Sequence, residues 1–168
     1  QANVRSSALV SWADFTPTVL DYAGASKAEK SVGRSLKPLI ENKTKKHRKQ
    51  IYGSHNFHEI HMYFPMRMIR RGDHKLIWNL AYQLPFPMAL DLRQSSTWQA
   101  FLKTKSDNFA GRPVEAFHTR DEFELFDLST DPSELRNLAG DPEYVSLLDE
   151  LQAELLEFMG ETDDPWLL

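Results

Sequence analysis

The sequence predicts an α+β fold: an antiparallel sheet of about four strands with a C-terminal helix packed across one face. Three observations lead to this prediction. Residues 65–80 alternate on both sides of a turn at residues 71–74, as a β-hairpin does. Residues 122–128 form another alternating segment, and residues 141–159 repeat apolar side chains at helical spacing.

The chain begins with a predicted short helix that is ended by Gly24. Asp14 is its expected N-cap, which puts Pro17 in the first turn, where the missing N–H costs little. Farther on, the run from Lys43 to Lys49 is polar and basic. A polyanion site is one interpretation of this run, but a mobile, solvated connector is the interpretation that we favour.

Strands are expected from Gln50 onward. The first begins at residues 51–55, and the predicted hairpin follows. Residues 81–120 are irregular except for a short helix around Ser96 to Lys103. Residues 122–128 carry apolar side chains on both faces, so we expect this strand to lie centrally in the sheet.

The last helix has the clearest signals. Asp141 is the expected N-cap, Pro142 occupies the first helical position and Glu143 adds a carboxylate to the first turn. Gly160 is the expected stop. The face predicted to pack in the core consists of Tyr144, Leu147, Leu148, Leu151, Leu155, Phe158 and Met159.

Composition narrows the function classes. The chain has 168 residues, 41% hydrophobic and 26% charged, which is typical of one soluble globular domain. A net charge of -4 argues against a general affinity for nucleic acid. The absence of cysteine excludes disulfides and thiolate metal sites, and no apolar run is long enough for a membrane span. Because the chain does not start with methionine, we expect it to be cut from something larger.

Residues 53–61 are the densest in groups that react near neutral pH. His55, His58 and His61 are three residues apart, which differs from the zinc-protease spacing. In an extended strand, His55 and His61 face one side and His58 the other, so we expect no complete metal site. A polar loop that binds an anionic or hydroxylated ligand is the favoured interpretation, and a purely structural role for at least two of the histidines stays open.

Four segments, in this order and spacing, resemble the C-terminal end of the sulfatase family: residues 8–24, 33–40, 63–80 and 124–144. Within the family the chain looks most like the heparan N-sulfatases, or sulfamidases. That likeness is carried by residues 53–67 (GSHNFHEIHMYFPMR), 79–91 (NLAYQLPFPMALD) and 161–166 (ETDDPW).

The resemblance implies the smaller C-terminal subdomain of an alkaline-phosphatase-like enzyme. Residues 1–49 would be a linker strip from the catalytic domain, and residues 50–168 the subdomain itself. The family's formylglycine nucleophile, in a C/S-x-P-x-R motif, and its calcium ion are expected in the missing catalytic domain. This chain has no such motif, so we expect no catalytic residue, no metal site and no activity in the chain alone.

The resemblance also implies a function for the parent protein: hydrolysis of a sulfate ester or sulfamide on a glycan, outside the cytoplasm. Its partners would be its own N-terminal catalytic domain and a sulfated glycan. When isolated, the first 40 residues should be loosely held or pair with another copy. We expect His55, His58 and Glu59 at the edge of the substrate pocket. Two alternatives stay open: a free-standing glycan or polyanion-binding module, and a purely structural subdomain.

Overall fold

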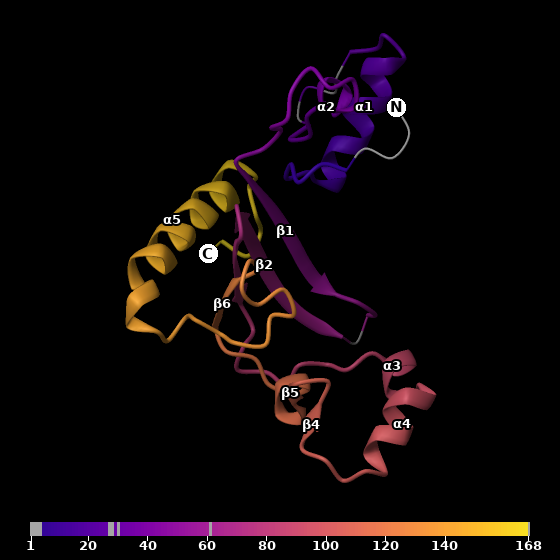
Figure 1. Ribbon diagram of the computed structural model, residues 1–168, viewed down its shortest axis with the longest axis vertical. Helices are drawn as coiled ribbons and strands as arrows, with labels where there is room; N and C mark the ends of the chain where they lie inside the picture. The colour runs from indigo at the N-terminus through magenta and orange to yellow at the C-terminus, as the bar shows by residue number, and fades with distance from the viewer. Residues whose placement is uncertain (1–4, 27–28, 30, 61, 168) are drawn as a thin grey trace. The chain divides into compact units, whose positions relative to one another are not determined.

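The computed structural model describes residues 5–26, 29, 31–60 and 62–167. The chain divides into two units, Gln1–Tyr52 (unit 1) and Gly53–Leu168 (unit 2) (Figure 1). The sequence placed the boundary between residues 49 and 50. The assignment of the first segment to a catalytic domain stays a prediction.

Unit 1 contains three short helical segments: η1 (Trp12–Asp14), α1 (Phe15–Tyr22) and α2 (Lys37–Ile40). Asp14 occupies the N-cap position of α1, as expected, but its side chain makes no capping bond there. Ser11 caps η1, its side chain accepting from the backbone N–H of Ala13. The first helix ends at Tyr22, just before Gly24 at a φ of +69°.

The carboxylate of Asp14 is instead the centre of a buried cluster in unit 1. It accepts from the backbone N–H groups of Arg34 (2.8 Å) and Ser11 (2.9 Å) and from Nε of Arg48 (2.9 Å), while Nε2 of His47 lies at 3.0 Å. Burial opposes ionisation, but the hydrogen bonds from Arg48, Arg34 and Ser11 outweigh it and hold the pKa of Asp14 well below its usual range.

The basic run is therefore not a uniformly solvated connector. Side chains of His47 and Arg48 expose only 7% and 13% of their surface, because both are bound to Asp14. The four lysines of the run are exposed, as expected. The interpretation was wrong for these two residues because their carboxylate partner lies more than thirty residues away in the sequence.

The main sheet has the strand order β1-β2-β3-β6, made of β1 (Gln50–Phe57), β2 (Tyr63–Arg71), β3 (His74–Asn79) and β6 (Phe123–Asp127). Strands β2 and β3 form the predicted hairpin, with Met68 opposite Ile77. Its two-residue turn begins at Gly72, whose φ of +60° is the conformation that glycine adopts without strain. The predicted α+β class is confirmed.

Strand β6 lies at an edge of the sheet, not at its centre. Its outer backbone groups are covered all the same: the Leu125 N–H donates to Oδ1 of Asn137 (2.9 Å), and its carbonyl accepts from the N–H of Leu138 (2.8 Å). This covering segment explains why an edge strand buries both Leu125 and Phe126.

The C-terminal helix α5 (Val145–Glu161) follows a short turn, η3 (Pro142–Tyr144), which Asp141 caps as predicted. Its buried face consists of Leu151, Leu155 and Met159, and it packs on β2 and β3 (Figure 1). Gly160 is not the stop. The helix continues one residue farther, and Asp163 takes the left-handed position at a φ of 51°.

Residues 81–120 hold more structure than expected. The predicted helix is present as α4 (Ser96–Leu102), but α3 (Leu90–Gln94), η2 (Val114–Phe117) and the small strands β4 (Asn108–Phe109) and β5 (Arg112–Pro113) were missed. Three of these elements, α4, β4 and η2, supply an aromatic cluster with ring centroids 4.8 to 5.9 Å apart. Its members are Trp98, Phe101, Phe109 and Phe117. In the described part of the chain, no helix has the length and apolar character needed to cross a bilayer.

Candidate functional site

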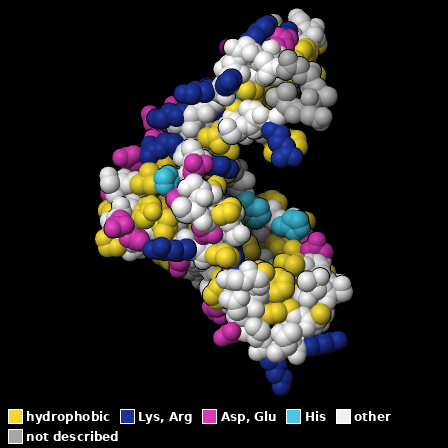
Figure 2. All heavy atoms as spheres, in the orientation of Figure 1, with side chains coloured by type: hydrophobic (Ala, Val, Ile, Leu, Met, Phe, Trp, Pro, Cys, Tyr) yellow, Lys and Arg dark blue, Asp and Glu magenta, His cyan; other side chains and the backbone are white. Residues whose placement is uncertain are grey.

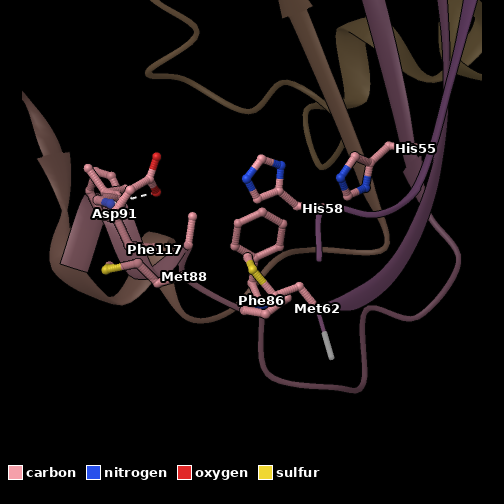
Figure 3. A pocket seen from close by; sticks show the side chains of 10 residues that line it. His55, His58, Met62, Phe86, Met88, Asp91 and Phe117 are labelled. Atoms are coloured by element: carbon pink, nitrogen blue, oxygen red, sulfur yellow. Dashed lines mark hydrogen bonds between the residues drawn. The ribbon is translucent and has the colours of Figure 1, made fainter. Parts of the chain in front are cut away.

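A pocket of about 310 Å³ lies within unit 2, where the end of β1 meets the segment that leads into α3 (Figure 3). Its polar groups are the imidazoles of His55 and His58 and the carboxylate of Asp91. The rest of the wall is mostly apolar, with Met62, Phe86, Met88 and Phe117 among its side chains.

His55 enters the pocket from β1 (Figure 3). Its Nδ1 lies 3.2 Å from the carbonyl oxygen of Phe64. A carbonyl oxygen only accepts, so Nδ1 carries the proton in this arrangement and Nε2 is left for another partner. The bond to Phe64 thus fixes both the orientation and the tautomer of His55.

His58 reaches the same pocket because β1 ends at Phe57. The chain bends at His58, so the strand rule that would turn the two imidazoles to opposite faces no longer applies. Figure 3 shows the His58 ring beside that of Phe86, projecting into the pocket. The third histidine, His61, lies outside the described residues.

Glu59 does not line the pocket. Its backbone carbonyl accepts from the N–H of Met62 (2.8 Å), and this turn brings the Met62 side chain to the pocket wall. Among the predicted binding residues the structure therefore brings His55 and His58 together, and leaves Glu59 beside them.

Asp91 is the carboxylate that sequence reasoning missed. It lies in the first turn of α3 and faces the pocket across from His58 (Figure 3). One of its oxygens accepts from the N–H of Leu92 (2.7 Å). Asp91 ends the segment 79–91, which carries part of the likeness to the sulfamidases, but nothing in the spacing indicates that a residue 33 positions beyond His58 shares its pocket.

The pocket can bind a ligand that combines an apolar ring face with polar edges. Aromatic and methionine side chains suit the face of a sugar ring, and the imidazole of His58 can donate to an anionic oxygen. Nε2 of His55, the ring nitrogen without a proton in that tautomer, and the carboxylate of Asp91 can accept from hydroxyls. Figure 2 shows histidine side chains beside a hydrophobic area on the face in view.

A calcium ion does not fit here. Within the described ranges, no three His, Asp or Glu side chains converge as a metal site requires.

Comparison with known proteins assigns this chain to a family. The profile described as N-sulphoglucosamine sulphohydrolase, C-terminal, matches residues 1–95. Human N-sulphoglucosamine sulphohydrolase is 35% identical over 177 residues, covering 96% of this chain and 34% of the human protein.

Two solved structures share the fold. BT4656, in complex with its substrate D-glucosamine-2-N,6-O-disulfate, is 27% identical with a TM-score of 0.58, over 90% of this chain and 24% of that one. BT1596, a 2-O GAG sulfatase, is 22% identical with a TM-score of 0.60, over 91% of this chain and 25% of that one.

The chain spans 34% of the length of the human protein and 30% of that of an ulvan-active sulfatase from Formosa agariphila, which is 30% identical over 95% of this chain. The family profile covers more than half of the chain, and the fold agrees with that of a sulfatase. The chain therefore belongs to the N-sulphoglucosamine sulphohydrolase C-terminal family, a C-terminal region of sulfatases.

Proposed function

We propose that this chain is the C-terminal part of a hydrolase that removes a sulfate group from a sulfated glycan, and that its His55–His58 pocket binds the sugar. The observation that carries the proposal is the convergence of two imidazoles in one pocket: that of His55, in β1, and that of His58, at the bend that follows β1. Family membership supplies the reaction class.

The substrate class that we favour is a sulfated glucosamine unit. N-sulphoglucosamine is part of the human relative's name, and BT4656 is described with a disulfated glucosamine as its substrate. Heparan sulfate is the glycan in which we expect that unit. A sulfated sugar suits the pocket because it offers an anion for His58, hydroxyls for Nε2 of His55 and for Asp91, and a ring face for Phe86.

Groups outside this chain carry out the removal of the sulfate group. Sulfatases use formylglycine and calcium, which supply a nucleophile and stabilise the sulfate oxygens. Neither fits on these residues: the sequence has no cysteine and no serine within an S-x-P-x-R motif, and the described side chains form no metal cluster. The residues of this chain bind and orient the sugar while a preceding catalytic domain acts on it, in an exported or lysosome-like location.

The test is His58→Ala in the longer protein that carries this chain. We expect kcat/KM for N-sulfoglucosamine to fall at least about tenfold, or roughly 1.4 kcal/mol, with little change in Tm. Asp91→Asn should have an effect of the same kind. Glu59→Ala, one residue from His58, tests the remaining sequence prediction, and we expect a smaller effect because Glu59 does not line the pocket.

Unchanged kinetics in His58→Ala, or a loss explained by unfolding, would return the pocket to a structural role. The purely structural subdomain would then be the better description of unit 2.

A further inference from the structure

The loop that carries His58 leaves β1 after Phe57 and returns at Tyr63, the first residue of β2. A loop with an exposed imidazole binds well only if its ends are held in place, because ordering it on binding costs conformational entropy. Both ends are held by one feature, the segment that follows α5.

The first end is held through Arg67, a charged side chain in β2 that exposes only 4% of its surface. Its Nη1 donates to Oδ1 of Asn56 (2.9 Å) and to the carbonyl oxygen of His55 (3.3 Å). Its Nη2 donates to Oδ1 of Asp164 (2.8 Å), and its Nε to the other carboxylate oxygen. One guanidinium thus joins the end of β1 to Asp164, which lies 97 positions beyond Arg67 in the sequence.

The second end is held through Trp166. Its indole Nε1 donates to the hydroxyl of Tyr63 (3.0 Å), and its ring lies 4.9 Å from the guanidinium carbon of Arg67. Its backbone N–H donates to Oδ1 of Asp164 (3.0 Å), so the tryptophan and the carboxylate are held together. The segment therefore reaches both sides of the loop.

These contacts exceed what attaching α5 to the sheet requires. Leu151, Leu155 and Met159 already bury the helix against β2 and β3. A charge pair this buried is costly to break, and the hydrogen bonds from Arg67 lower the pKa of Asp164, so the carboxylate stays charged.

We propose that Arg67, Asp164 and Trp166 are positioning residues, which touch no ligand but fix the loop between β1 and β2 and so place His58 in the pocket. Any effect on turnover rests on the proposed function; the effect on the loop does not.

The test compares Asp164→Asn and Trp166→Phe with Asp163→Asn, the adjacent exposed carboxylate. Asparagine suits the left-handed conformation of residue 163, so the control loses a charge without added strain. The measurement is made on the 168-residue chain. We expect Asp164→Asn and Trp166→Phe to speed amide hydrogen exchange of residues 58–60 and 62 at least about tenfold and to shift the His58 imidazole NMR signals. Amides of α5 and β3 should keep their protection.

Loop exchange equal to that of Asp163→Asn would overturn the inference. So would a general loss of protection across α5 and β3, which would make the pair an ordinary stabilising contact.

Kinetics in the longer protein separate the two proposals. We expect Asp164→Asn to raise KM at least about threefold, with kcat nearly unchanged. If Asp164→Asn speeds exchange of the loop but His58→Ala leaves the kinetics unchanged, the positioning role of Arg67, Asp164 and Trp166 stands and the proposed function fails. If His58→Ala lowers kcat/KM and Asp164→Asn behaves as Asp163→Asn does, only the positioning role fails.

Discussion

The two units of this chain are stabilised in different ways. Unit 2 has an apolar core whose largest members expose at most 1% of their surface: Phe64, Ile69, Leu76, Leu125, Leu151, Leu155 and Met159. Among the described residues of unit 1, no large apolar side chain is buried, and the buried side chains are those of Asp14, Pro17, Thr18 and His47. One unit is held by hydrophobic packing, and the other by hydrogen bonds to a carboxylate.

Several apolar side chains of unit 1 are exposed. Along η1 and α1, Trp12 exposes 92% of its surface, Phe15 62%, Val19 52% and Tyr22 51%, at spacings that place them on one helical face. A segment of this kind gains little from its own packing. The sequence predicts that it lies against a catalytic domain, and that prediction stays open.

The largest effect should come from the core of unit 2. Leu151→Ala should cost about 2 to 5 kcal/mol, because it leaves a cavity where the leucine is fully buried. Leu156→Ala, on the exposed side of the same helix, is the control. Urea denaturation measures both, and a loss below about 1 kcal/mol for Leu151→Ala would mean that α5 is peripheral.

The next effect should appear in unit 1. Asp14→Asn should destabilise it by about 2 to 3 kcal/mol, since His47 and Arg48 lose their buried charge partner. Hydrogen exchange of residues 8–23 should rise while that of α5 stays the same. Asp21→Asn, at a more exposed carboxylate of α1, should have less effect. Loss of protection in both units would show that they do not fold independently.

Both units should lose stability in acid, for the same reason. The folded-state pKa values of Asp14 and Asp164 are lowered, so the unfolded chain binds more protons as the pH falls. The contribution of each carboxylate is present above its unfolded pKa of about 4 and is lost as the pH falls through the folded value. Asp164→Asn should flatten this dependence in unit 2 alone. Hydrogen exchange at several pH values measures the stability of each unit. If Asp164→Asn leaves the loss of stability in acid unchanged in unit 2, Asp164 is not the cause of that loss.

The smallest effect should come from the exposed lysines of unit 1. Neutralising Lys45 and Lys46 should change stability by no more than about 0.5 kcal/mol, whereas Arg48→Gln in the same run should match Asp14→Asn.

The native chain should also elute early from a heparin column. Elution only at high salt, reversed by the lysine changes, would favour the free-standing polyanion-binding module.

Predictions from local patterns succeeded where neighbouring residues decide the conformation. The hairpin around Gly72 was confirmed, because its alternation and its turn residue both act over a few positions. The predicted core face of the last helix was confirmed at Leu151, Leu155 and Met159 for the same reason. Its other members, Tyr144, Leu147, Leu148 and Phe158, are only half-buried. The central position predicted for residues 122–128 was wrong, because two apolar faces on a strand can also be covered by the chain that follows it.

By itself, the sequence determined the α+β class, the hairpin, the last helix and the candidate histidines His55 and His58. Alternation, helical spacing and imidazole chemistry are properties of short segments. Only the tertiary structure decided which polar groups meet: Asp14 with His47 and Arg48, and Arg67 with Asp164. It also placed Asp91 in the same pocket as His58. Such pairs are 33 to 97 residues apart, and a carboxylate's role depends on which cation or hydrogen-bond donor the fold places beside it.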